Sequence, residues 1–113
     1  MRSKSLPTWA GRSQFQYEGS ILEGTKIHFG QDSRSAFNVS KDVYAKMLIQ
    51  FSGREVSIGT SRTDPPKGSL GKWFQENCTR IALASYIGPI LVEEGYAERG
   101  SEPDRILIKR RTV

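Results

Sequence analysis

The chain has 113 residues, 36% of them hydrophobic, and a formal net charge of +5. This length builds one hydrophobic core but not two, so we expect a single domain over residues 1–113. No stretch approaches the roughly 20 apolar residues of a membrane-spanning helix, which argues against a membrane partner, while the positive charge favours polyanionic partners.

The chain holds one cysteine, Cys78, and one histidine, His28. A single thiol forms no internal disulfide, so we expect a reducing, cytoplasmic location. Metal sites built on a pair of cysteines or a pair of histidines are excluded as well, and we expect no metal and no cofactor.

The first thirteen residues are basic and lack the apolar run of a secretory signal, so we expect a flexible arm over residues 1–13. Residues 14–39 are predicted to form a β-hairpin extension. Its strands cover residues 14–22 and 25–30, where apolar and polar side chains alternate. Glu23-Gly24 is the expected two-residue hairpin loop, because glycine accepts a positive φ.

A short strand over residues 36–39 leads into the first predicted helix, which Ser40 caps with its hydroxyl group. Gly53 ends this helix. Its buried face consists of apolar side chains at helical spacing, namely Tyr44, Met47, Leu48 and Phe51. A short strand over residues 54–59 follows, and the two prolines of the loop over residues 60–69 prevent regular structure there.

Two helices and a second hairpin complete the chain. Ser69 caps a helix that ends near Asn77, and a longer helix is predicted over residues 80–94. The apolar side chains that anchor the longer helix are Leu83, Ile87, Ile90 and Leu91. Pro89 predicts a kink inside this helix, or a restart of the helix at Pro89 itself. Two strands then pair around the turn GSEPD.

The elements over residues 40–111 follow the order helix, strand, helix, helix, strand, strand, and their last part reads ILVEEGYAERGSEPDRILIKRR. This order and this segment resemble the winged helix-turn-helix family. We therefore expect an α+β fold with an N-terminal β-hairpin followed by a winged-helix-like core over residues 40–111. In that family the third helix enters the major groove of DNA, and the last hairpin, the wing, lies on the DNA backbone.

The resemblance implies a DNA-binding surface on the polar side of the longer helix, beside the preceding loop and the wing. Side chains on these elements can meet phosphates or base edges. The candidate nucleic-acid-binding residues are Arg62, Lys67, Lys72, Arg80, Ser85, Tyr86, Arg99, Arg105, Lys109 and Arg110. We expect a protein that binds duplex DNA as a homodimer, in the manner of a small transcriptional regulator.

The second hypothesis is an α+β protein-interaction or homo-oligomeric module that binds no nucleic acid. One fold hosts either role, and the N-terminal segments FQYEGSIL and TKIHF can pair edge to edge between subunits. Tyr86 suits a protein interface as well as it suits DNA. We expect no catalytic residues, because Glu93 and Glu94 point apart on a helix and the loop GTSRTDPPKGS lacks the spacing of a phosphate-binding loop.

Overall fold

A computed structural model describes residues 3–30, 34–61, 63–79 and 82–110. The elements in this part of the chain are β1 (Lys4–Pro7), β2 (Gln14–Ser20), β3 (Gly24–Phe29), β4 (Ser35–Val39), α1 (Lys41–Phe51), β5 (Glu55–Ser57), α2 (Leu70–Asn77), α3 (Ala84–Glu93), β6 (Ala97–Arg99) and β7 (Arg105–Ile108). The expected α+β class is confirmed. The predicted order of helix, strand, helix, helix, strand, strand from α1 to β7 is also confirmed.

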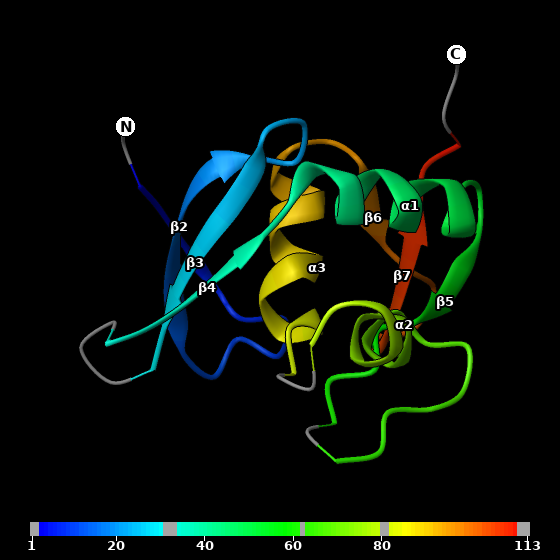
Figure 1. Cartoon of the computed structure of the whole chain (residues 1–113). Helices are drawn as coiled ribbons and strands as arrows, with labels where there is room; N and C mark the ends of the chain where they lie inside the picture. The colour runs from blue at the N-terminus through cyan, green and yellow to red at the C-terminus, as the bar shows by residue number, and fades with distance from the viewer. Residues whose placement is uncertain (1–2, 31–33, 62, 80–81, 111–113) are drawn as a thin grey trace.

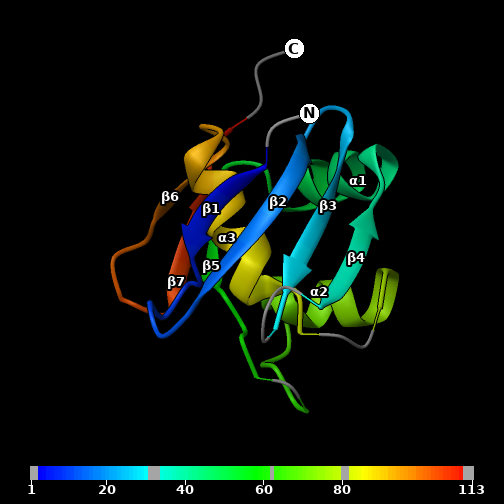
Figure 2. The same cartoon turned by 90° about the vertical axis from the view of Figure 1, so that its left-hand side faces the viewer.

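The N-terminal strands form one antiparallel sheet in the order β1-β2-β3-β4 (Figure 2). The predicted hairpin lies within it, but β2 ends at Ser20, which pairs with Gly24 across the hairpin. Three residues therefore connect β2 to β3, rather than the expected loop of Glu23-Gly24. Ile21 explains the difference, because its side chain turns into the core and is 2% exposed.

The expectation of a flexible arm over residues 1–13 is wrong for the residues that the structure describes. Lys4–Pro7 form β1, which pairs with β2 along its whole length. Trp9 follows and is only 5% exposed. Burial of an indole ring gives the N-terminal segment a fixed place that its basic composition does not indicate.

The helices of the described residues begin where the capping residues predict or close to it. Ser40 and Ser69 each accept a hydrogen bond from the backbone amide three residues later, so they cap α1 and α2. The helix expected over residues 80–94 is described as α3, Ala84–Glu93. None of the helices in the described residues is long and apolar enough to cross a membrane.

The second sheet has three antiparallel strands in the order β5-β7-β6, and α3 lies between it and the four-stranded sheet (Figures 1 and 2). One hydrophobic cluster runs from Phe15 and Ile27 in the first sheet, through Ile90 in α3, to Ile106 in β7. Since α3 is covered on two sides, it is the centre of the fold rather than a surface helix.

Candidate interaction surface

The polar side of α3, expected to face DNA, instead faces the four-stranded sheet. The ring of Tyr86 stacks on Phe29 at a centroid distance of 5.1 Å and meets Phe15 edge-on at 5.2 Å. The carbonyl oxygen of Ser85 accepts a 2.9 Å hydrogen bond from the backbone amide of Trp9. The structure thus corrects the expected orientation, because the ring of Tyr86 packs on the four-stranded sheet of the same chain and the backbone of Ser85 is bound to the N-terminal segment.

Pro89 lies inside α3, and the helix continues through it without the restart that was one of the expected outcomes. Proline has no backbone amide to donate to the carbonyl four residues earlier, which is that of Ser85. Trp9 supplies the missing donor. Gly88 makes room for the same residue, since a Cβ atom there would lie 2.7 Å from the indole ring. Gly88 and Pro89 together form the docking place of Trp9.

Arg99, expected in the DNA-contacting wing, holds Trp9 from the other side. Its guanidinium lies 4.1 Å from the centroid of the indole ring and donates a 3.0 Å hydrogen bond to the carbonyl oxygen of Trp9. The indole Nε1 of Trp9 donates to the carbonyl oxygen of Pro103 at 2.9 Å. Arg99 therefore links the β6–β7 hairpin to the N-terminal segment.

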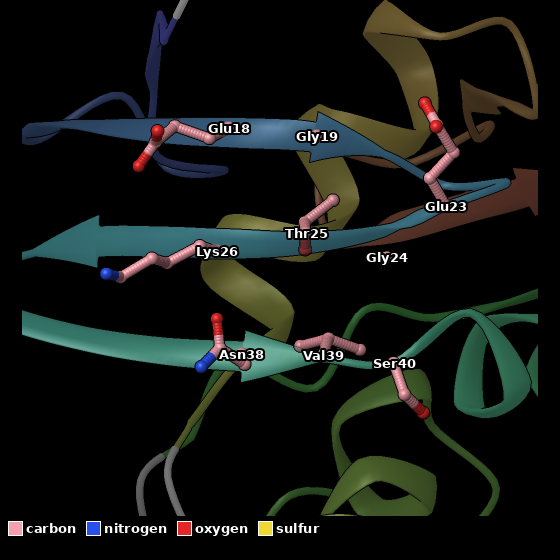
Figure 3. A pocket seen from close by; sticks show the side chains of 9 residues that line it. All are labelled: Glu18, Gly19, Glu23, Gly24, Thr25, Lys26, Asn38, Val39 and Ser40. Carbon is pink, nitrogen blue, oxygen red and sulfur yellow. The ribbon is translucent and has the colours of Figure 1, made fainter. Parts of the chain in front are cut away.

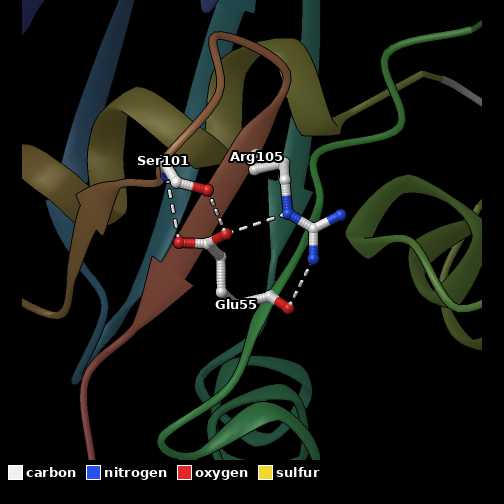
Figure 4. Close-up of polar contacts among 3 residues, drawn as sticks. All are labelled: Glu55, Ser101 and Arg105. Atoms are coloured by element: carbon white, nitrogen blue, oxygen red, sulfur yellow. Dashed lines mark hydrogen bonds and ion pairs between the residues drawn. The ribbon is translucent and has the colours of Figure 1, made fainter.

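Arg105, another expected DNA contact, is bound to Glu55 (Figure 4). Its Nε atom lies 3.0 Å from Oε2 of Glu55, and its Nη2 atom donates to the carbonyl oxygen of Glu55 at 3.0 Å. Ser101 donates to the same carboxylate from its hydroxyl group at 2.7 Å and from its backbone amide at 3.0 Å. The bonds from Ser101 and then from Arg105 hold the pKa of Glu55 below its usual value.

The remaining candidate cations are spread over several elements. Lys67 and Arg110 are exposed, Lys72 is half-buried, and Lys109 lies 3.9 Å from the carboxylate of Glu98. The other two candidates, Arg62 and Arg80, lie outside the described residues. DNA binding stays a prediction, but α3, the helix expected to enter the major groove, is packed between the two sheets (Figures 1 and 2).

The outer face of the four-stranded sheet is polar and carries a shallow depression of about 500 Å³ (Figure 3). The depression lies beside Gly24, between Ser40 and the row of Glu18, Lys26 and Asn38. Glu18 also lies 2.7 Å from Nε2 of His28, and this hydrogen bond lowers the pKa of Glu18. In the residues that the structure describes, no three His, Cys, Asp or Glu side chains gather where they could hold a metal ion.

The free edges of the two sheets differ in how they are protected. Natural sheets guard an exposed edge strand with charged side chains or proline, which discourage pairing with another chain. Edge strand β1 carries Lys4 and Pro7, β5 carries Glu55, and β6 carries Glu98 and Arg99. The fourth edge is β4, whose sequence SAFNV has no charge and no proline. Of the seven described strands, β4 alone lacks a charged side chain.

The outer edge of β4 is the candidate interaction surface. Within the described part of the chain, β4 pairs with β3 on one side and makes no other backbone hydrogen bond (Figure 2). Ala36 and Asn38 are exposed, while Phe37 and Val39 point to the core. The sequence contained a signal for this surface, a strand without charge, but only the topology identifies that strand as an edge.

Neither the protein-family models, nor the curated proteins, nor the solved structures contain a match to this chain.

Proposed function

We propose that the protein is an interaction module that binds an extended polypeptide by adding it as a new strand at the β4 edge. The observation that carries the proposal is the combination found in β4, an open backbone edge with no charge and no proline. This is the protein-interaction hypothesis of the sequence with a different site, because β2 and β3, the strands expected to pair between subunits, lie inside the sheet and β4 lies at its edge. The contacts of the Arg99, Arg105 and Tyr86 side chains within the chain remove support from the DNA-binding hypothesis.

The physical basis is the row of unpaired N–H and C=O groups that an edge strand presents. An added strand would lie about 4.8 Å from β4, the usual spacing between neighbouring strands. It would form main-chain hydrogen bonds with alternate residues of this row. The edge is already held in shape, because β4 pairs with β3 over all five residues and Val39 is anchored in the core. A preformed edge loses little conformational entropy on binding, which favours association.

The elements from α1 to β7 would serve as a winged-helix-like scaffold for the four-stranded sheet. The element order from α1 to β7 and the strand order β5-β7-β6 support a winged-helix-like core. Its third helix, α3, would then serve to seat the four-stranded sheet instead of reading DNA. In this arrangement the core holds the sheet from its inner face and leaves the β4 edge accessible.

The experiment uses a fluorescein-labelled peptide of residues 34–40, RSAFNVS, as the probe. We expect saturable binding with a dissociation constant on the order of 100 μM or tighter, measured by fluorescence anisotropy. In ¹H–¹⁵N spectra the peptide should shift the amide signals of residues 35–39. A peptide with proline at its central position is the control, since it lacks a donor and should bind more weakly. No binding at about 1 mM peptide, or shifts confined to another surface, would contradict the proposal.

A further inference from the structure

We infer that the strand that pairs with β4 is β4 of a second copy of this chain, antiparallel to it and centred on Phe37. This inference rests on the proposed function and adds the identity of the partner and the register of pairing. A two-fold axis between the two paired strands, at the level of Phe37, lets both copies use the same surface, as in most dimers. Three features of β4 lead to this arrangement.

The first feature is the number of residues that each register pairs. An axis at Phe37 pairs all five residues of β4, with Ser35 opposite Val39, Ala36 opposite Asn38, and Phe37 opposite its own copy. An axis at Ala36 or at Asn38 pairs only three residues. An axis between two residues would set an inward side chain against an outward one, because side chains alternate between the faces of a sheet. The register centred on Phe37 is therefore favoured.

The second feature is the fit of the side chains in that register. On the inner face, the half-buried ring of Phe37 meets the ring of Phe37 of the second copy, and aromatic cross-strand pairs are stabilising. On the outer face, the methyl group of Ala36 meets the neutral amide of Asn38 of the second copy. No two charges of the same sign become cross-strand neighbours at the seam, since β4 has none.

The third feature is closure. Pairing through β4 joins the two four-stranded sheets into one, in which both free edges are β1 strands. Each β1 carries Lys4 and Pro7, so the joined sheet has no unguarded edge left. A heterologous partner strand would also cover β4, but it would bring an outer edge of its own, whereas self-pairing leaves only the two β1 edges. Association should stop at the dimer and should not continue to a fibre.

Five paired residues form a small contact, so we expect a dimer with a dissociation constant on the order of tens of micromolar. The experiment is sedimentation equilibrium of the full chain from about 5 μM to about 500 μM, with paired charge variants on the outer face of β4. Two variants carry like charges, Ala36→Lys with Asn38→Lys, and Ala36→Glu with Asn38→Glu. The third variant carries opposite charges, Ala36→Lys with Asn38→Glu.

The register fixes the expected results. Each like-charge variant sets two pairs of equal charges across the seam and should be at least tenfold weaker in dimerisation. An equimolar mixture of the two like-charge variants should form a heterodimer. The opposite-charge variant should dimerise at least as tightly as the unmodified chain, whereas an axis at Ala36 would set the introduced lysine against its own copy. The matched control, Gln14→Lys with Gln16→Lys, adds the same charge to β2 on the outer face and should leave the dimer intact.

Thermal unfolding of each variant at low concentration verifies that it is folded, and both substituted side chains are exposed. If the like-charge variants dimerise as the unmodified chain does, the β4 seam is wrong. If the opposite-charge variant and the mixture stay monomeric, the register is wrong. If the unmodified chain is monomeric throughout but binds the RSAFNVS peptide at β4, self-association fails while the proposed function survives. A monomer that does not bind the peptide either overturns both.

Discussion

The backbone amide of Trp9 donates a 2.9 Å hydrogen bond to the carbonyl oxygen of Ser85. In an unbroken helix that carbonyl would accept from residue 89, but residue 89 is proline and has no amide hydrogen. The hydrogen bond that α3 lacks at Pro89 is therefore supplied by Trp9, a residue far from α3 in the sequence. The four-stranded sheet and α3 are held together at this point, which makes Trp9 the first target for mutation.

Trp9→Ala should lower the free energy of unfolding by about 3 to 5 kcal/mol, the usual cost of removing a large buried aromatic side chain. The substitution also removes the donor to Pro103 and the ring under Arg99. Urea denaturation followed by circular dichroism measures the change. Leu22→Ala is the control, because Leu22 is 70% exposed and its truncation should cost little. A loss below about 1 kcal/mol for Trp9→Ala would contradict its place in the core.

Gly88→Ala should destabilise the protein although alanine is the better helix former. The added methyl group would lie 2.7 Å from the indole of Trp9 and 2.8 Å from the Cδ1 atom of Ile58, so the core would have to shift. Overpacking of this kind costs about 1 to 3 kcal/mol. The same substitution in the Trp9→Ala background should cost less, since the space is then free. Equal costs in the two backgrounds would show that Gly88 and Trp9 are not in contact.

Arg99→Ala should lower stability and leave any binding to duplex DNA unchanged. The side chain stacks on Trp9 and bonds to its carbonyl oxygen, and loss of both contacts should cost about 1 to 2 kcal/mol. Chemical denaturation measures the stability, and a DNA titration at about 50 mM and about 200 mM salt measures the electrostatic binding. If Arg99→Ala weakened a salt-dependent DNA complex without affecting stability, Arg99 would be a DNA contact, as the sequence analysis expected.

Acid should weaken the attachment of the β6–β7 hairpin to β5, because this attachment runs through Glu55. Bonds from Ser101 and Arg105 hold the folded-state pKa of Glu55 below its value in the unfolded chain. The stabilising contribution is therefore complete above the unfolded pKa, near 4.3, and is lost as the pH falls through the lower folded value. Comparing stability at pH 7 and pH 3 for the unmodified chain and for Glu55→Gln tests this. The glutamine variant should show a smaller loss in acid, and an identical pH dependence would exclude Glu55 as a contributor.

Two of the four tyrosines should make the stability of the fold fall at alkaline pH. Burial raises the pKa of Tyr17 and of Tyr44, and Tyr17 also donates a 2.7 Å hydrogen bond to Glu94. Both groups stabilise the fold fully below the unfolded tyrosine pKa, near 10, and this stabilisation is lost as the pH rises beyond it. Absorbance at 295 nm should show two tyrosines that ionise only on unfolding. Tyr17→Phe and Tyr44→Phe should each remove one, and four tyrosines titrating together near pH 10 would refute the prediction.

Features of the fold that depend on near neighbours in the sequence could be predicted from it. Ser40 and Ser69 cap their helices through amides three residues away, and the apolar spacing of α1 is a property of eleven adjacent residues. The place of Trp9 could not be predicted, because its partners Ser85, Arg99 and Pro103 are all far along the chain. Local pattern carries no information on contacts of that kind.

The orientation of α3 was misjudged for a reason visible in its composition. A helix that reads DNA exposes one polar face, but α3 carries no charged side chain between Ala84 and Val92. Gly88 and Pro89 are small or lack a donor, which suits close approach of other parts of the chain. An uncharged helix of this length indicates a helix packed between other elements, as α3 is between the two sheets (Figures 1 and 2). The β4 edge was missed because strand order depends on which strands pair, and the sequence pattern does not state it.

The hydrogen bonds of Trp9 to Pro103 and from Arg99 join residues 94 and 90 positions apart. During synthesis the amino-terminal strands leave the ribosome long before the residues that receive the indole ring exist. The apolar faces of these strands therefore stay uncovered until the β6–β7 hairpin has emerged. We expect a chain truncated before Arg99 to be unable to enclose the indole ring of Trp9.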